Sequence, residues 1–126
     1  MKSKIVHKLP KIVLTYGLVD DALQGVLKVS NTCNVIVRQV MPSELDIKIK
    51  DLLKVSQTNL EHYSSDCDTC LLMCNFDKKS IDEYLYSLRS SHVKVMLKAV
   101  ATSTNVEWSY RKLLDELMLE RQNFTK

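Results

Sequence analysis

The residue types best suited to metal or redox chemistry in this chain are the cysteines between positions 67 and 74. Cys67, Cys70 and Cys74 follow a C-x2-C-x3-C spacing, and His62 lies nearby as a candidate fourth ligand. Thiolates at such spacing can bind zinc or an iron–sulfur cluster, and a C-x-x-C pair can be redox-active. Cys70 and Cys74, however, fall within an apolar run that predicts a strand, whereas a redox C-x-x-C normally opens a helix. We therefore expect a structural role for these thiols, and a metal or redox site is the alternative.

A second group of polar residues follows the last predicted strand. Lys98, Thr102, Asn105 and Trp108 lie at and just beyond its end, which in a parallel sheet is the edge where α/β proteins bind ligands. Lys98 would supply charge, Thr102 and Asn105 would supply hydrogen bonds, and the next helix would point its N-terminus at an anion. The alternative is a structural corner, in which Asn105 or Thr104 caps that helix and Trp108 fills the core. All of these residue types except the lysine favour the structural corner.

Motifs for the common catalytic sites are absent from the sequence. His7, His62 and His92 are far apart, and neither an H-E-x-x-H nor a G-x-S-x-G motif occurs. Gly17 and Gly25 are the only glycines, so a glycine-rich loop that cradles phosphate cannot be formed. We expect the protein not to be an enzyme and to need no cofactor.

Charge and hydropathy exclude further classes of function. The net charge of +3 and the pI of about 8.6 are mild, and lysines alternate with acidic residues along the chain, so we expect no binding to nucleic acid. No apolar run of membrane-spanning length occurs, and the basic N-terminus is not followed by the apolar run of a signal peptide. The four cysteines are unevenly spaced, which is typical of a reducing compartment. These features predict a cytoplasmic protein that does not bind membranes.

The first half of the chain alternates between the patterns of strands and of helices. Residues 12–16 are β-branched and apolar and end at Gly17, which predicts a buried strand. Asp20 or Asp21 can cap the helix that follows, and a second strand is expected over 35–40. Pro42 opens a second helix, in which Ser43 and Asp46 have the spacing of a capping box.

The second half follows the same order. Residues 70–74 predict a strand, and Asp77 can cap the helix that follows it. Residues 93–100 predict a fourth strand. The last helix is preceded by Thr104 and Glu107, again with the spacing of a capping box.

The two halves can be laid over each other with a nearly constant offset of about 60 residues. This agreement predicts two β-α-β-α pseudo-repeats, over about 10–63 and about 70–124, within a single domain that spans residues 1–126. The expected fold class is α/β, with a mostly parallel four-stranded sheet covered by helices. The sequence does not determine the strand order, although the order 2-1-3-4 would preserve a pseudo-twofold relation.

The second half carries a string of residues that resembles a known family. Leu97-Lys98-Ala99-Val100 ends a strand, Thr102-x-x-Asn105 forms a turn, Trp108 follows three residues later, and Leu113-Leu114-x-Glu116-Leu117 lies in a helix. These features resemble the bacterial and archaeal domain of unknown function number 3783, and the resemblance spans roughly residues 71–120. It implies the β-α-β-α fold for this half and assigns no activity.

The sequence departs from the family pattern at two turns. Ser103 stands where the family often has proline, and Asn75-Phe76-Asp77 replaces a turn that contains glycine. The first half of the chain shows no such resemblance.

These observations favour a non-catalytic module that contacts another protein or a second copy of itself. A duplicated unit often replaces a homodimer by a fused pair. A small anionic ligand at the strand ends is the second hypothesis, and a metal or redox site at the cysteines is the third.

Overall fold

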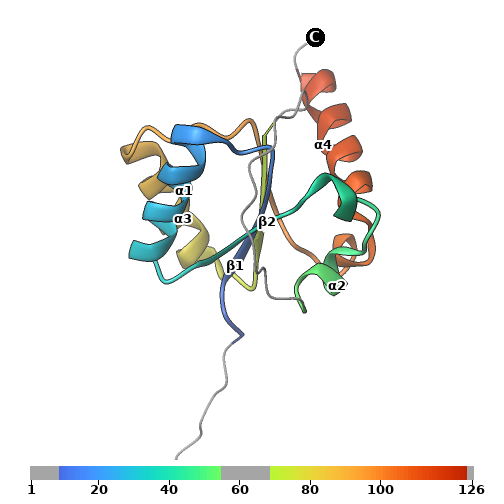
Figure 1. The fold of residues 1–126 in the computed structure, drawn as a ribbon, viewed down its shortest axis with the longest axis horizontal. Coiled ribbons are helices and arrows are strands. Elements are labelled where there is room, and N and C mark those ends of the chain that lie inside the picture. The colour runs from blue at the N-terminus through green and yellow to red at the C-terminus, as the bar shows by residue number, and fades with distance from the viewer. Residues whose placement is uncertain (1–8, 55–68, 125–126) are drawn as a thin grey trace, which may run out of the picture.

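The computed structural model describes residues 9–54 and 69–124, which form one α/β domain with three layers (Figure 1). The elements follow in this order: β1 (Ile12–Tyr16), α1 (Asp20–Thr32), β2 (Ile36–Gln39), the 3-10 helix η1 (Pro42–Glu44), α2 (Ile49–Leu52), β3 (Cys70–Cys74), α3 (Lys78–Ser90), β4 (Leu97–Val100), the 3-10 helix η2 (Asn105–Glu107) and α4 (Tyr110–Phe124). The four strands form a single sheet that lies between two pairs of helices.

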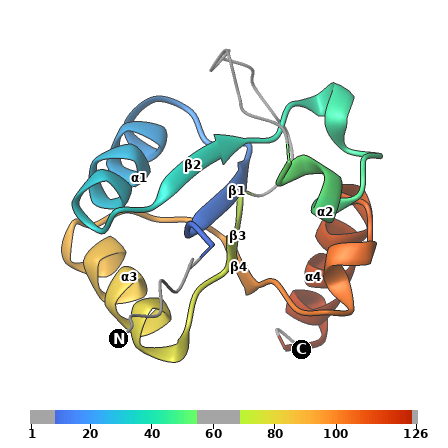
Figure 2. The ribbon, with the colours of Figure 1, turned by 90° about the horizontal axis from the view of Figure 1, so that it is seen from below.

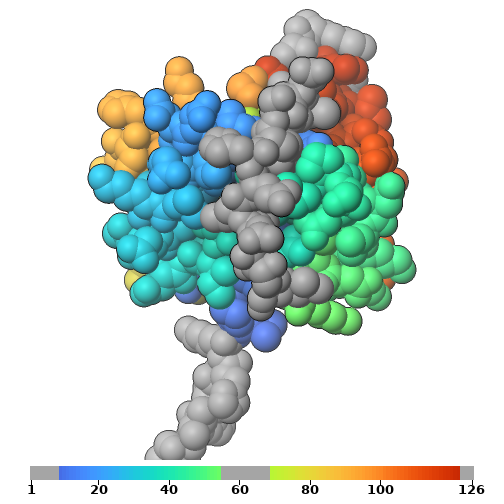
Figure 3. All heavy atoms as spheres, viewed as in Figure 1, coloured from blue at the N-terminus to red at the C-terminus, as the bar shows by residue number. Residues whose placement is uncertain are grey.

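Each face of the sheet is covered by one pair of helices. Helices α1 and α3 pack on one face, and α2 and α4 lie on the other (Figure 2). In β1 and β3, consecutive residues point to opposite faces, so Val13 and Leu71 pack beneath α1 and α3, whereas Leu14 and Leu72 pack with Tyr110 on the side of α4. Two hydrophobic cores result, separated by the central strands. Helix α1 and the η1–α2 segment lie on opposite sides of the molecular face in Figure 3.

The sheet is mixed, and the expectation of a mostly parallel sheet is wrong. Its order is β2-β1-β3-β4. The outer pairs are parallel, but β1 and β3 run antiparallel, with Leu14 opposite Leu72 at the centre of the pairing. A helical crossover imposes parallel pairing only within each β-α-β unit. Strands β1 and β3 belong to different units, so the parallel rule does not extend across the middle of the sheet.

The first β-α-β unit contains β1, α1 and β2, and the second contains β3, α3 and β4. In both units, the turn after the first strand and the turn after the helix contain a residue with left-handed backbone. Gly17 after β1 has φ 79° and Asn75 after β3 has φ 67°, while Asn34 and His92 after the two long helices have φ 59° and 58°. Glycine and asparagine adopt this conformation at low cost. Two matching backbone hydrogen bonds end these helices, one from Val35 N–H to the Ser30 carbonyl at 2.8 Å and one from Val93 N–H to the Leu88 carbonyl at 2.9 Å.

The helix expected to open at Pro42 is broken into two short pieces. Between η1 and α2, Lys48 has extended backbone and forms an isolated antiparallel bridge with Ser109. Ile49 N–H donates to the Trp108 carbonyl at 2.8 Å, and Tyr110 N–H donates to the Ile47 carbonyl at 3.3 Å. Because this bridge requires extended backbone at Lys48, one helix cannot run from η1 into α2. The same bridge separates η2 from α4.

Strand β4 is shorter than the predicted strand over 93–100. In the first unit Ile36 follows directly after Val35 and donates its N–H to the Lys11 carbonyl at 2.9 Å. In the second unit Leu97 makes the matching bond to the Thr69 carbonyl at 2.9 Å, with three additional residues between it and Val93. The additional segment bends at Met96, so pairing with β3 begins only at Leu97.

In the part of the chain that the structure describes, no helix combines the length and the apolar character that crossing a membrane requires. The longest, α4, has 15 residues, whereas about 20 mostly apolar residues are needed.

Candidate functional site

The turn after β4 brings Thr102 and Asn105 together. Thr102 N–H donates to Asn105 Oδ1 at 2.8 Å, and Asn105 N–H donates to Thr102 Oγ1 at 3.0 Å. The Asn105 side chain also donates its Nδ2 hydrogen to the Val100 carbonyl at 3.1 Å. These reciprocal bonds close the corner between β4 and η2, so the polar groups of Asn105 already have partners within the turn.

Lys98 does not join this pair. It alternates with Leu97 and Ala99, which pack in the core beneath α2 and α4, so its side chain lies on the opposite face of the sheet. The side chain is exposed, and Nζ donates to the Val95 carbonyl at 3.0 Å. The lysine therefore reaches solvent because β4 is an edge strand, and it points away from Asn105.

Trp108 packs against the core on the side of α2 and α4, where it is partly buried. Lys112 Nζ lies 5.0 Å from the centroid of the Trp108 ring, within the range of a cation–π interaction. Of the four residues predicted to bind a ligand, the structure thus joins only Thr102 and Asn105 by direct hydrogen bonds. A ligand-binding role for the four stays a prediction.

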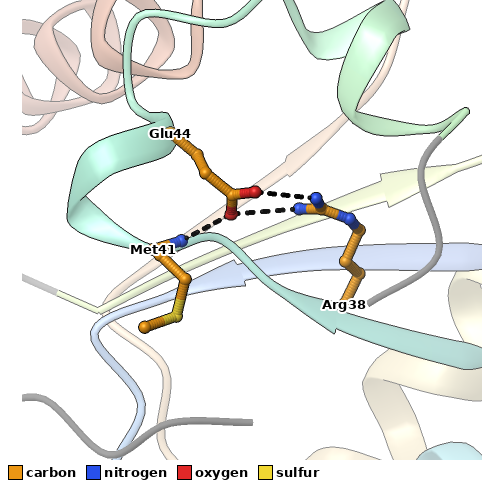
Figure 4. Close-up of polar contacts among 3 residues, drawn as sticks. All are labelled: Arg38, Met41 and Glu44. Carbon is orange, nitrogen blue, oxygen red and sulfur yellow. Dashed lines mark hydrogen bonds and ion pairs between the residues drawn. The ribbon is translucent and has the colours of Figure 1, made fainter. Parts of the chain in front are cut away.

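The corresponding corner after β2 contains a nearly buried ion pair (Figure 4). Met41 N–H donates to Glu44 Oε1 at 3.0 Å, as Thr102 N–H does to Asn105. The Glu44 carboxylate also accepts hydrogen bonds from both terminal nitrogens of Arg38, the shorter at 2.9 Å. Partial burial alone would raise the pKa of Glu44, but the bonds from Arg38 and Met41, together with the charge of Arg38, hold it below its usual value.

Sequence reasoning missed this ion pair, although a signal for it was present. Arg38 is the one charged residue in the apolar run over 35–40, and its exposed fraction in the structure is only 6%. A charged side chain inside a predicted buried strand requires a partner of opposite charge. Glu44 is the nearest acidic residue that follows it in the sequence.

The described cysteines of the cluster are buried in the sheet. Cys70 and Cys74 begin and end β3 and pack in the core on the side of α4, while Cys67 and His62 lie outside the described residues. Because a strand rises about 3.3 Å per residue, Cα atoms four positions apart are about 13 Å apart, too far for both sulfurs to bind one metal ion. Among the described residues, no group of three or more His, Cys, Asp and Glu side chains could hold a metal ion.

The buried thiols are expected to be unreactive in the folded protein. Burial raises the pKa of Cys70 to about 11 and that of Cys74 to about 12, so at pH 8 about one Cys70 thiol in a thousand is ionised. Only the thiolate reacts with iodoacetamide. Peptide mass spectrometry after brief treatment at pH 8 should find Cys33, which is partly exposed, modified before Cys70 and Cys74. Rapid modification of either buried thiol in the native protein would contradict this expectation, and urea should make all thiols react.

The outer edge of β4 carries backbone groups that the sheet does not use. Leu97 and Ala101 donate their N–H groups toward β3, to the carbonyls of Thr69 and Met73. In a parallel ladder alternate residues face the same neighbour, so Lys98 and Val100 face outward. The Val100 carbonyl accepts the bond from Asn105. The N–H groups of Lys98 and Val100 and the Lys98 carbonyl have no partner among the described residues.

The outer edge of β2 differs from that of β4. On β2 the outward residues are Val37 and Gln39, because Ile36 and Val40 donate toward β1. The Gln39 side chain is buried, where it accepts from Thr15 Oγ1 and donates to the Leu18 carbonyl, and Gln39 takes part in further interactions. Within the described residues, Val37 is thus the one outward residue of β2 whose backbone has no partner, whereas β4 leaves the backbone N–H groups of both Lys98 and Val100 open.

Two cavities of the described region lie outside the predicted site. A groove of about 450 Å³ between α1 and α3 is lined mainly by small or polar residues, among them Gly25, Thr32 and Ser87. A second cavity, of about 400 Å³, lies beside the turn after β3 and includes Lys11 and Asn75. Within residues 9–54 and 69–124, every buried side-chain nitrogen or oxygen has a hydrogen-bond partner. Neither cavity therefore holds a buried polar group that lacks a partner and awaits a ligand.

Comparison of the chain with curated proteins and with solved structures found no match. A family model does match its second half: residues 69–124, from the residue before β3 to the end of α4, match a domain of unknown function, DUF3783. The resemblance noted in the sequence is thereby confirmed for residues 69–124.

Proposed function

We propose that this protein is a non-catalytic module that binds another protein through the open edge of its sheet at β4. The observation that supports this proposal is the unused hydrogen-bonding capacity of Lys98 and Val100 on that edge. An extended segment of a partner can add to such an edge as a further strand, because its backbone supplies the missing donors and acceptors.

The side chains around the edge support the same proposal. Met96 and Val100 have exposed fractions of 51% and 36%, although both are apolar. On the equivalent face of β2, Val37 packs against the core of α1 and α3 and Gln39 is buried. Helix α3 thus leaves the face of β4 uncovered beside the open edge, where a partner strand would find apolar contacts.

A synthetic peptide can test whether this edge accepts a strand. The peptide Thr-Val-Thr-Gln-Thr-Val-Thr, blocked at both ends, has high strand propensity and no charge. We expect its titration into the isotopically labelled full-length protein to shift the backbone amide signals of Lys98 and Val100, measured by NMR. Shifts confined to the α1–α3 groove, or no shift at millimolar peptide, would contradict the proposal.

The variant Val100→Pro provides the decisive control. Proline removes the outward N–H of Val100 and leaves the β3–β4 hydrogen bonds intact, since those use Leu97, Ala99 and Ala101, and edge strands tolerate proline on the solvent side. We expect peptide binding to weaken at least tenfold in this variant. The matched variant Val100→Thr keeps the N–H and should retain binding. Unfolding curves of both variants show whether the fold is intact.

We further propose that the two β-α-β units arose by duplication. In support of this, β1 and β3 have equal lengths, as do α1 and α3. The bonds of the bridge are also reciprocal, with Ile49 bonded to Trp108 and Tyr110 to Ile47. The sequence-based expectation of a cytoplasmic location is likewise a proposal, supported by the free thiols of Cys33, Cys70 and Cys74.

A further inference from the structure

We infer that the segment bound at β4 is extended and acidic, with a carboxylate placed to meet Lys98. This inference rests on the proposed role of the β4 edge and adds the chemistry of the partner. It is carried by the charge of the edge, by the apolar side chains that flank that charge, and by the geometry that a second copy of the chain would need.

Within the described residues, two lysines that have no acidic partner lie in β4 or shortly before it. Lys94 and Lys98 are both exposed, and neither takes part in an ion pair within the described residues, whereas Lys48, Lys50, Lys54, Lys78 and Lys112 do. Among the residues that the structure describes, Lys98 Nζ donates only to the Val95 carbonyl, and an ammonium group has three hydrogens to donate. The edge therefore presents uncompensated positive charge and spare donors to whatever binds it.

Apolar side chains lie on both sides of this charge. Met96 precedes Lys98 by two residues and Val100 follows it by two, and both are exposed. Cross-strand neighbours interact best when apolar residues face apolar residues and opposite charges face each other. The matching segment thus has one acidic residue with an apolar residue two positions away on each side.

The charge of the edge disfavours a second copy of this chain as the occupant. Antiparallel pairing of β4 with β4 of another copy would bring the two Lys98 side chains close to each other, and like charges opposite each other destabilise a strand pair. An edge lysine can also serve only to prevent aggregation. If Lys98 only prevents aggregation, the protein should show no preference among peptides of different charge. Peptide binding therefore distinguishes this role from the binding of an acidic partner.

The test compares three peptides that differ at one residue. They are Thr-Val-Thr-Glu-Thr-Val-Thr, its glutamine counterpart described above and its lysine counterpart, each titrated into the full-length protein while the amide signals of Lys98 and Val100 are followed. We expect the glutamate peptide to bind about fivefold more tightly than the glutamine peptide, and the lysine peptide more weakly than both. Because the charges are exposed, this difference should shrink in 0.5 M salt.

Charge reversal of the protein gives the matching control. The variant Lys98→Glu should prefer the lysine peptide over the glutamate peptide, while Lys28→Glu, which changes an exposed lysine on α1, should leave the original order unchanged. If Lys98→Glu retains the original order, the inference is wrong.

The remaining outcomes separate the two proposals. Equal binding of all three peptides at β4 would overturn the acidic partner and leave the edge as a binding surface. Binding of none of them would overturn both proposals. Light scattering that shows a dimer, together with changed β4 amide signals at that concentration, would identify a second copy as the occupant and overturn the acidic partner.

Discussion

Replacing Glu44 by glutamine should lower the free energy of unfolding by about 2 kcal/mol at pH 7. The carboxylate is the acceptor for Arg38, whose side chain is only 7% exposed, and a neutral amide compensates a nearly buried guanidinium poorly. The hydrogen bond from Met41 can survive, because glutamine keeps one acceptor oxygen. Urea unfolding followed by Trp108 fluorescence measures the change.

The same ion pair predicts how stability depends on pH. Glu44 has a pKa below its ordinary value of 4.5 in the folded protein, so its contribution is fully present above that value. The contribution is lost as the pH falls through the lowered pKa, where the folded protein takes up the proton. The difference in stability between the native protein and Glu44→Gln should therefore be largest near pH 7 and shrink below pH 4.5.

Glu107→Gln is the matched control for this prediction. Glu107 occupies η2 as Glu44 occupies η1, and it pairs with Lys50 at 2.9 Å, but both of these side chains are largely exposed. Exposed pairs contribute little, so this variant should unfold close to the native protein. An unchanged unfolding midpoint in Glu44→Gln would show that the Arg38 pair does not stabilise the fold.

Asn105→Ala should also lower the free energy of unfolding by about 2 kcal/mol. The substitution removes the acceptor for Thr102 N–H and the donor to the Val100 carbonyl, and it leaves two backbone groups of a partly buried corner without partners. Asn105→Asp keeps the acceptor and loses the donor, so its effect should be about half as large. Thermal unfolding of the full-length variants measures both.

This prediction also decides between the two hypotheses for the strand-end residues. If Asn105 serves a small anionic ligand, the native protein should gain thermal stability with phosphate, nucleotides or carboxylates, and Asn105→Ala should abolish that gain while unfolding at nearly the native temperature. Thr102→Ser keeps the hydroxyl that accepts Asn105 N–H and should differ little from the native protein in either case.

Local sequence patterns predicted the two central strands and the helix α3 well. The run over 12–16 and the run over 70–74 coincide with β1 and β3, because buried strands consist of short apolar runs that end at a turn. Asp77 caps α3 as expected, with its carboxylate accepting Ser80 N–H at 2.8 Å. Helix α1 begins at Asp20, but its N-cap is Val19, so the prediction that Asp20 or Asp21 caps this helix is wrong.

Features that depend on distant partners were not predicted. Asp46, expected to belong to a capping box with Ser43, instead binds Arg111 of α4 at 2.8 Å, a residue remote in the sequence. The direction of β3 relative to β1 depends on how two units pack, and each unit alone carries no information about it. The cap of α4 also differs from the predicted one for this reason: Ser109, the bridge partner of Lys48, accepts Lys112 N–H with its Oγ at 3.1 Å.

The sequence predicted the positions of some, but not all, of the residues in the candidate site. Thr102 and Asn105 were expected at one turn and are joined there, since three residues of spacing suffice for such a corner. Lys98 was recognised as unusual, but its exposure follows from the position of β4 at the edge of the sheet, and the sequence did not determine the strand order.

The bridge between Lys48 and Ser109 joins the two halves of the molecule by hydrogen bonds at a second place, outside the sheet. The first place is the antiparallel ladder of β1 and β3, and the bridge lies on the side of α2 and α4. A hinge motion needs a single axis about which the two halves can rotate, and two separate sets of hydrogen bonds between the halves leave no such axis. Neither half can swing away while the other stays in place, so we expect the domain to lose its structure in one cooperative step.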